Sequence, residues 1–375
     1  MNKIFNRIFF WLIAVLWMGY VILNMASPEK TFLETENRLP AKFPEFTLEA
    51  LINGQYMPKL ESYLNDQFVG RANWITVKTA AEKLMGKTDS GGVYFGKDGY
   101  LIEKHEPDQN QTQTNVESIK NMLESLKDKY NTQVLIAPTA SLILNDKLPP
   151  FAPVWNQSEL IDKVAALGNF VDVRDTLYEH KDEYIYYRTD HHWTSLGAYY
   201  AYVQLCNALG IQPLSIESEL VKETLSDEFM GTLAAKVNQS GNPDILDTYH
   251  TSLGLKVNYN QGQIITDTLY EKKYLDQRSK YSVFLNENQP YVEITTDNKN
   301  GKTLVMVKDS YAHCMVPMLV NHYERVVLLD FRSLNMGFVS QAIPMIEEGG
   351  KIDDIVVLYN AENFTNERTV YMLAK

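Results

Sequence analysis

The sequence has few of the residues that build several common kinds of site. Two cysteines among 375 residues cannot form a disulfide framework, and neither a CxxC spacing nor a Cys/His cluster suggests a structural metal. There is no GxGxxG fingerprint and no complete GxxxxGKS or GxxxxGKT phosphate loop, so nucleotide cofactors are not expected. The net charge is −12 without a basic stripe, which argues against nucleic acid. We therefore expect no cofactor and no metal.

One long hydrophobic run stands near the N-terminus. Lys3 and Arg7 precede Ile8 to Leu23, an apolar and aromatic stretch close to the roughly 20 residues that a membrane-crossing helix needs. The basic residues predict that this end stays in the cytoplasm. A cleaved signal peptide is the alternative: Ala26 suits position −1, but Asn24 at −3 does not. We favour an uncleaved anchor, and either interpretation places the remaining chain outside the cytoplasm.

The chain divides into three expected parts. Residues 1–27 are the anchor or signal segment, residues 28–111 hold a linker, a helical region and a hairpin, and residues 112–375 form an α/β domain. The hairpin is predicted from VYFGKDGYLIE, in which two apolar runs flank a turn sequence. Residues 213–300 are polar and rich in tyrosine, and we expect them to be an insertion or lid.

Short apolar runs alternate with helical stretches in the third part. The expected strands are Val134–Ala137, Phe170–Val173, Leu304–Val307, Val326–Leu329 and Ile355–Tyr359. The expected helices are Val116–Tyr130, Ser195–Leu209, Tyr311–His322 and Val339–Glu348, with Gly210 as a left-handed cap. Continuously apolar strands separated by helices predict a parallel sheet that is covered on both faces.

Ser310 has the position that a nucleophile needs. It follows a buried strand after a two-residue turn and opens a helix, so its hydroxyl is expected at the carboxyl edge of the sheet, where open α/β folds bind ligands. Its backbone N–H could face a developing oxyanion. The alternative is that Asp309 or Ser310 only caps the helix.

The stretch TDHHW offers an acid and a base. In an extended segment Asp190 and His192 share a face, and His191 points the other way. A carboxylate two residues before an imidazole can accept its Nδ1–H and leave Nε2 free as a base. We therefore predict Asp190, His192 and Ser310 as a catalytic triad, with Trp193 packed on the ring or walling the pocket. A buried structural histidine pair and a metal site are the alternatives.

Other residues near strand ends are weaker candidates. Arg188 and Arg332 could bind an anionic substrate or a carbonyl oxygen, or could form ordinary ion pairs. His313, three residues after Ser310, is expected to be exposed or to cap the helix.

The sequence resembles the DHHW family, which is similar in turn to SGNH-type acetyltransferases such as the alginate acetylation proteins AlgJ and AlgX. The resemblance rests on YRTDHHWTSLGAY and on weaker pieces in family order: ENRLP, DQFVGR, VYFGKDGYLI, FMGT, VKDSYA, VPMLVNHYERVVLLD and DDIVVLYN. It implies a circularly permuted SGNH hydrolase-like fold and the same triad. Lys308 replaces the glycine of GDS-type hydrolases, and Asn288 and Gly231 are the candidates for the oxyanion site.

These expectations combine into one functional hypothesis. The protein would be a membrane-anchored O-acetyltransferase that takes an acetyl group from a membrane-bound acyltransferase partner and passes it through Ser310 to a cell-envelope polysaccharide. An acetyl esterase with the same triad, in which water is the acceptor, and a non-catalytic glycan-binding protein of the envelope are the alternatives.

Overall fold

The computed structural model describes residues 3–33, 39–239 and 241–375. Residues 34–38, which carry most of the ENRLP piece, lie outside the described residues. The chain forms two compact units. The smaller unit contains the chain up to Lys87 together with residues 235–239, and the larger unit contains the remainder.

The smaller unit is helical. Its first helix, α1 (Lys3–Ala26), coincides with the apolar run, and its segment Ile4–Ala26 is long and apolar enough to cross a membrane, with a mean hydropathy of 2.1. Three shorter helices follow, namely α2 (Leu48–Ile52), α3 (Tyr56–Gln67) and α4 (Arg71–Leu84). The predicted apolar helix is confirmed. Its role as an anchor, and its orientation, stay predictions.

A seven-stranded mixed sheet forms the centre of the larger unit. Four neighbouring strands are parallel, in the spatial order β4 (Asn131–Ala137), β12 (Asp354–Asn360), β10 (Thr303–Lys308) and β11 (Arg325–Leu329). The sheet continues with three antiparallel strands, β9 (Tyr291–Thr296), β7 (Leu255–Tyr259) and β8 (Ile264–Thr266). The expected parallel sheet is therefore only part of a larger one, because residues 255–296 extend it.

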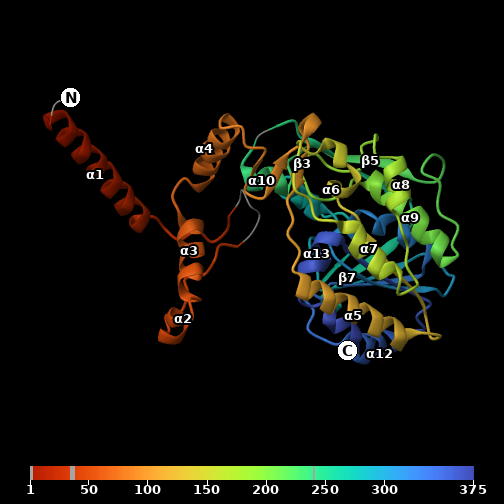
Figure 1. Ribbon diagram of the computed structural model, residues 1–375. Helices are drawn as coiled ribbons and strands as arrows, with labels where there is room; N and C mark the ends of the chain where they lie inside the picture. The colour runs from red at the N-terminus through yellow and green to blue at the C-terminus, as the bar shows by residue number, and fades with distance from the viewer. Residues whose placement is uncertain (1–2, 34–38, 240) are drawn as a thin grey trace. The chain divides into compact units, whose positions relative to one another are not determined.

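The parallel strands are buried on both faces because their side chains alternate between two cores. In β10, Leu304 and Met306 enter the first core, and Val305 and Val307 enter the second. The first core is covered by α9 (Ser195–Leu209) and α11 (Val316–Leu319). The second is covered by α5 (Gln109–Leu126), α7 (Gln157–Ala165), α12 (Ile343–Glu347) and α13 (Ala361–Asn366) (Figure 1). Helices on both faces, as the apolar runs predict, are confirmed.

Smaller elements complete the larger unit. The predicted hairpin is present as β2 (Val93–Phe95) and β3 (Leu101–Glu103), and β1 (Asp89–Ser90) pairs with the other side of β2. Elsewhere in the unit, β5 (Val221–Phe229) pairs with β6 (Asp244–His250). The remaining short helices are α6 (Ala140–Ile143), α8 (Arg174–Glu179) and α10 (Thr232–Val237). α10 begins in the larger unit, and its last three residues, 235–237, belong to the smaller unit.

Three local predictions have clear outcomes. Gly210 caps α9 with φ 72°, as expected. Phe170 makes only a single bridge to Val134, so the predicted strand there is reduced to one pair. The helix expected after Ser310 is broken into a 3-10 turn (Ser310–Cys314), α11 and a second 3-10 turn (Val320–His322), because Pro317 lies in the first turn of α11 and cannot donate a backbone hydrogen bond.

Candidate active site

Ser310 lies at the carboxyl edge of the sheet, two residues after β10, where the parallel strands β12 and β11 end on either side. Asp309 holds this turn. One of its carboxylate oxygens accepts a hydrogen bond from the Tyr311 N–H (2.8 Å), and the other accepts from the Asn360 N–H (2.8 Å) and side-chain amide (2.7 Å). Because Asn360 ends β12, Asp309 ties the serine turn to the neighbouring strand. Asp309 is thus the cap, and the Ser310 hydroxyl is left for another partner.

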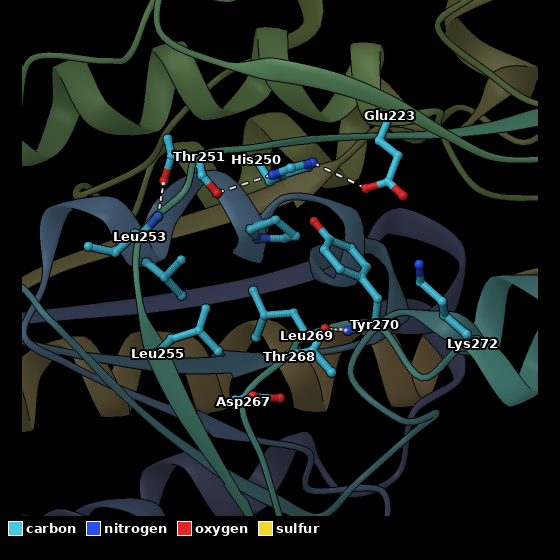
Figure 2. A pocket seen from close by; sticks show the side chains of 12 residues that line it. Glu223, His250, Thr251, Leu253, Leu255, Asp267, Thr268, Leu269, Tyr270 and Lys272 are labelled. Atoms are coloured by element: carbon cyan, nitrogen blue, oxygen red, sulfur yellow. Dashed lines mark hydrogen bonds and ion pairs between the residues drawn. The ribbon is translucent and has the colours of Figure 1, made fainter.

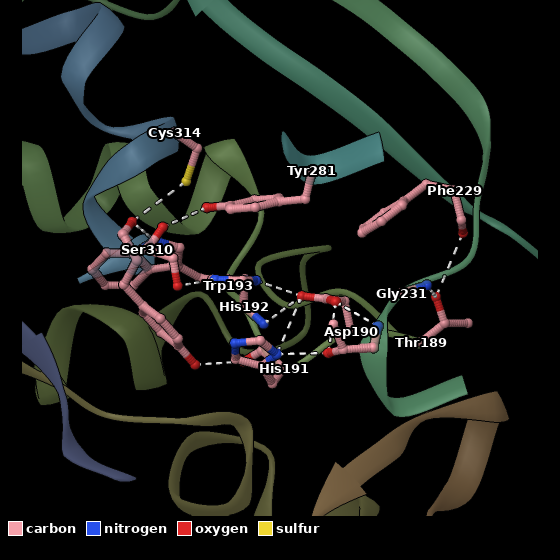
Figure 3. Close-up of polar contacts among 12 residues, drawn as sticks. Thr189, Asp190, His191, His192, Trp193, Phe229, Gly231, Tyr281, Ser310 and Cys314 are labelled. Carbon is pink, nitrogen blue, oxygen red and sulfur yellow. Dashed lines mark hydrogen bonds and ion pairs between the residues drawn. The ribbon is translucent and has the colours of Figure 1, made fainter. Parts of the chain in front are cut away.

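The acid–histidine loop, residues 187–192, is a tight loop and not an extended segment. Tyr186 and Trp193 form an antiparallel bridge, and the Tyr187 N–H donates to the His192 carbonyl at 3.2 Å. The expectation that His191 points away from His192 is therefore wrong, since their ring centroids lie 3.9 Å apart. The loop turns both rings towards the same side (Figure 3).

A continuous hydrogen-bonded series joins Asp190, His192 and Ser310 (Figure 3). His192 Nδ1 lies 2.5 Å from Asp190 Oδ1, and His192 Nε2 lies 2.8 Å from Ser310 Oγ, across 118 residues of sequence. An ionised carboxylate only accepts hydrogen bonds, so the proton of the neutral ring belongs on Nδ1. Nε2 is then an acceptor for the Ser310 hydroxyl, which is the arrangement that a general base requires.

Asp190 is buried, yet its surroundings keep it ionised. Burial alone would raise the pKa of the carboxyl group, but the His191 and His192 rings and several hydrogen bonds hold the pKa of Asp190 well below its usual range. Oδ2 accepts from the Thr232 N–H at 2.8 Å and from the Thr232 hydroxyl at 3.0 Å. Because that hydroxyl donates to Asp190, His191 Nδ1, 2.7 Å from Thr232 Oγ1, is the donor in their hydrogen bond.

Gly231 lies against the acid, and its N–H donates to Thr189 Oγ1 at 2.9 Å, so this N–H is engaged and does not point to an oxyanion. A Cβ atom at Gly231 would lie 2.2 Å from Asp190 Cβ, so only glycine allows this backbone to reach the carboxylate. The FMGT piece is therefore part of the acid's support. A second support is Asp244, which the sequence did not single out and which accepts from the Arg188 N–H (2.9 Å) and the Thr189 N–H (2.7 Å).

Trp193 joins the two halves of the site from within the core. Its side chain is fully buried, and its indole N–H donates to the Tyr311 carbonyl at 2.9 Å. The Tyr311 hydroxyl donates in return to the His191 carbonyl at 2.5 Å. The expectation that Trp193 walls a substrate pocket is corrected, because a fully buried ring cannot contact a bound substrate.

Tyr281 contacts both His192 and Ser310, and no sequence signal distinguishes it among 23 tyrosines. Its ring stacks on His192 with centroids 4.0 Å apart and planes at 13°, and its hydroxyl donates to the Ser310 carbonyl at 3.0 Å. Burial raises the pKa of Tyr281 well above its usual value, which keeps the hydroxyl protonated as a donor. Tyr281 therefore fixes the plane of the imidazole and the turn that carries the serine.

Replacing Tyr281 separates these two contacts. Tyr281→Phe keeps the stacked ring and removes the hydroxyl with its hydrogen bond to the Ser310 carbonyl. It should lower kcat by up to about tenfold, since one neutral hydrogen bond is worth about 0.5–1.5 kcal/mol. Tyr281→Leu also removes the stacked ring and should cost more. Steady-state kinetics of the two variants would test this, and equal losses in both would contradict a role for the ring.

A buried polar network lies beside the serine turn. Lys308 is fully buried, with Nζ 2.7 Å from His313 Nε2 and 3.6 Å from Asp330 Oδ2. His313 is also buried, and burial lowers its pKa well below the usual value, so the expectation of an exposed or capping histidine is wrong. Asp330 binds Arg332 through both carboxylate oxygens, at 2.8 and 2.5 Å, and Arg332 also donates to Asn288 Oδ1 at 3.0 Å. The two candidate substrate residues Arg332 and Asn288 thus meet, and Arg332 is engaged as an ion pair.

Lys308 predicts a pH effect on stability. Burial lowers the pKa of Lys308 to about 8, and the Asp330 carboxylate offsets only part of that effect. Between pH 8 and the ordinary lysine value of 10.5 the unfolded chain binds more protons than the folded protein, so this group makes the free energy of unfolding rise with pH. Urea denaturation at pH 8–10 should show this rise, and Lys308→Met should reduce it. Equal slopes in the two proteins would contradict the assignment.

Arg188 faces aromatic rings. Its guanidinium lies 4.7 Å from the centroid of the Tyr184 ring and 5.7 Å from that of Tyr100. This stacking accounts for its position, and a role in substrate binding stays a prediction.

A separate pocket has a volume of about 260 Å³ (Figure 2). Its walls come from β5, β6, the segment 267–272, and Pro317 and Val320 in and just after α11. His250 lies in it, with Nε2 3.2 Å from Glu223 Oε2, and Tyr270 and Leu269 form part of its wall. The residues that line this pocket do not include Ser310 or His192.

The donor atoms of Asp190, His191 and His192 lie within 4.8 Å of one another, close enough to suggest a metal site. However, His192 Nδ1 and Asp190 Oδ1 are hydrogen-bonded to each other, and His192 Nε2 faces Ser310. A metal would have to displace these bonds, so the arrangement suits proton transfer better than ligation.

The fold and the site define a class: an α/β protein with a serine, a histidine and an aspartate in hydrogen-bonded series at the carboxyl edge of its parallel strands. The profile of the family described as DHHW protein matches residues 91–329, more than half of the sequence, and the chain belongs to the DHHW family. The resemblance predicted from the sequence is confirmed, and the four letters of the family name are residues 190–193.

Two solved structures with TM-scores above 0.5 support the fold. The chain is similar to a DHHW family protein from Eubacterium siraeum DSM 15702, with 24% identity over 76% of this chain and 95% of that one and a TM-score of 0.64. It is also similar to Bacillus cereus PatB1 with a sulfonyl adduct, with 16% identity over 74% of this chain and 97% of that one and a TM-score of 0.61. The O-acetyltransferase domain of Pseudomonas putida AlgJ matches with 14% identity over 76% and 98% and a TM-score of 0.49. A comparison with curated proteins finds no match.

Proposed function

We propose that this protein is an O-acetyltransferase that modifies a cell-envelope polysaccharide outside the cytoplasm. The observation that carries the proposal is the series Asp190–His192–Ser310, with His192 Nε2 2.8 Å from Ser310 Oγ and Asp190 on the opposite side of the ring. The resemblance of the surrounding motifs to envelope acetyltransferases favours a glycan hydroxyl as acceptor.

The reaction would run in two steps. In the first, Ser310 Oγ attacks the acetyl carbonyl carbon while His192 Nε2 takes the hydroxyl proton, and the donor leaves with that proton. In the second, His192 takes a proton from the acceptor hydroxyl, whose oxygen attacks the acetyl-serine ester, and the proton returns to Ser310 Oγ. Asp190 remains ionised and stabilises the imidazolium that forms in each step.

The acetyl donor would be presented by a membrane-bound acyltransferase. This part of the proposal follows from α1, the candidate membrane span, which would hold the protein at the bilayer with Lys3 and Arg7 on the cytoplasmic side. The circular permutation of the SGNH-like fold belongs to the same proposal, because the acid–base element precedes the serine in the chain.

The test is an assay of the full-length protein in detergent with p-nitrophenyl acetate, in the presence and absence of oligosaccharide acceptors. Acetylated oligosaccharide, detected by mass spectrometry, is the expected product. Acetate release alone, unchanged by acceptors, would replace the proposal with an esterase. No activity with any acyl ester, together with glycan binding, would favour a non-catalytic envelope protein.

A covalent probe tests the nucleophile independently of the acceptor. A sulfonyl fluoride should modify Ser310, and peptide mass spectrometry would locate the adduct. Ser310→Ala should abolish labelling, whereas Ser333→Ala, which removes an exposed serine, should not change it. Labelling that persists in Ser310→Ala would contradict the assignment of the nucleophile.

A further inference from the structure

The end of the apolar helix is bonded to the start of α4. Val69 is held through both of its peptide groups: its carbonyl accepts from the Tyr20 hydroxyl at 2.5 Å, and its N–H donates to Asn24 Oδ1 at 2.9 Å. The Trp74 indole N–H donates to the same Tyr20 oxygen at 2.9 Å, and the Phe68 ring lies 5.3 Å from the Tyr20 ring. These contacts place the beginning of α4 at the level of Tyr20 and Asn24 on α1.

That level can be compared with the thickness of a bilayer. The candidate span Ile4–Ala26 has 23 residues and is therefore about 35 Å long, slightly longer than the roughly 30 Å hydrocarbon core. Tyr20 precedes Ala26 by six residues, or about 9 Å along the helix axis. Tyr20 and Trp74 would therefore lie just inside the boundary between headgroups and acyl chains, the zone in which tyrosine and tryptophan are enriched.

α4 presents an apolar stripe to its surroundings. Trp74, Val77 and Leu84 recur at helical spacing and are 54%, 58% and 90% exposed. The opposite side of the helix is packed, since Thr79 is buried and donates to the Val237 carbonyl at 3.1 Å. Lys78, exposed beside the stripe, has the long side chain that reaches from such a depth to the headgroups.

We propose that α4 lies in the membrane interface on the outer side, with Trp74, Val77 and Leu84 in the region where headgroups meet acyl chains. The occupant of this face is lipid, because the hydrogen bonds to Tyr20 and Asn24 fix the depth of the first turn of the helix. An amphipathic helix with a tryptophan on its apolar face and a lysine beside it binds at that depth. The proposal rests on α1 being a membrane span. It goes beyond the proposed reaction, since residue 88, which follows α4 and begins the larger unit, would be kept near the bilayer surface.

Site-specific labels can test this in the full-length protein. The two native cysteines, Cys206 and Cys314, are buried, so single cysteines introduced by Val77→Cys or Leu84→Cys can carry an environment-sensitive fluorophore. Lys120→Cys in α5, at an exposed lysine, is the aqueous reference, and Ile13→Cys in α1 is the hydrocarbon reference. Each protein is reconstituted alone in nanodiscs of phosphatidylcholine and phosphatidylglycerol and titrated with iodide as an aqueous quencher.

The labels at positions 77 and 84 should show blue-shifted emission and several-fold weaker quenching than the label at 120. Quenching at 77 and 84 equal to that at 120, with protection at 13, would overturn the proposal and leave the membrane span intact. Exposure at 13 as well would overturn both. Tyr20→Phe, which removes the hydroxyl bonded to Val69 and Trp74, should increase quenching at 77, whereas Tyr63→Phe in α3 should not.

Discussion

Ser310→Ala and His192→Ala should each lower the rate of acetyl transfer by about 10⁴-fold or more, because the members of a triad act as a unit. The geometry gives the reason. With His192 Nε2 2.8 Å from Ser310 Oγ, the hydroxyl loses its base when the imidazole is removed, and the base has nothing to activate when the hydroxyl is removed. Purified variants assayed with p-nitrophenyl acetate and an oligosaccharide would give the ratio of kcat/KM.

The double variant is the sharper measurement. If the two residues act in one step, Ser310→Ala/His192→Ala should be no slower than the slower single variant. Losses that multiply would indicate independent roles. His191→Ala is a comparison for the neighbouring ring: its Nδ1 contacts Thr232 and lies 3.7 Å from Asp190 Oδ1 but does not bond the serine, so this variant should lose far less activity than His192→Ala. A loss in His191→Ala as large as that in His192→Ala would contradict our choice of base.

Gly231→Ala should be the most damaging change outside the triad. A Cβ atom there would lie 2.2 Å from Asp190 Cβ and 2.5 Å from Oδ2, so the acid must move. A displacement of about 1 Å in a catalytic constellation can cost on the order of 10²-fold in rate, and crowding a packed site typically costs about 1–3 kcal/mol of stability. Activity and urea denaturation should be measured on the same preparation.

Gly254→Ala provides a control. Its Cβ atom would also meet an aspartate, but only at the end of the side chain, 2.1 Å from Asp297 Oδ2, and that aspartate takes no part in the series of Asp190, His192 and Ser310. Because the end of the Asp297 side chain can turn away, this variant should lose less stability than Gly231→Ala and keep its kcat. If Gly231→Ala loses no more activity than Gly254→Ala, Asp190 does not need its observed position.

Much of the fold follows from short-range patterns. The apolar runs of β4, β10, β11 and β12 are continuous because each strand is buried on both faces, and this property is visible in sequence. The partners of the antiparallel strands are not visible in this way. Residues 213–300 are polar and suggest an insertion or lid, yet β9 within them pairs with β11 and extends the sheet, since strand pairing depends on contacts that are distant in the chain.

The candidate site also combines residues that sequence patterns identify with residues that only the folded chain brings in. The DHHW run and the KDS turn identify Asp190, His192 and Ser310 as candidates by residue type and by their position after buried strands. Their selection rested partly on an extended geometry that is wrong, because residues 187–192 form a tight loop that turns both histidines to one side. Tyr281 and Asp244 had no signal in the sequence, and the burial of Lys308 against His313 was not expected, because each of these residues acts through a contact made only in the folded chain.

The sequence by itself therefore determined the family, the apolar helix, the doubly covered parallel strands and the residue types of the proposed nucleophilic site. Only the tertiary structure decided how these residues meet. His192 Nε2 and Ser310 Oγ, 118 positions apart in the sequence, are brought to 2.8 Å at the sheet edge, and Trp193 and Tyr311 hold the two segments together through hydrogen bonds in the core. Local patterns report what each segment buries, whereas a distance between two side chains is fixed by all the packing between them.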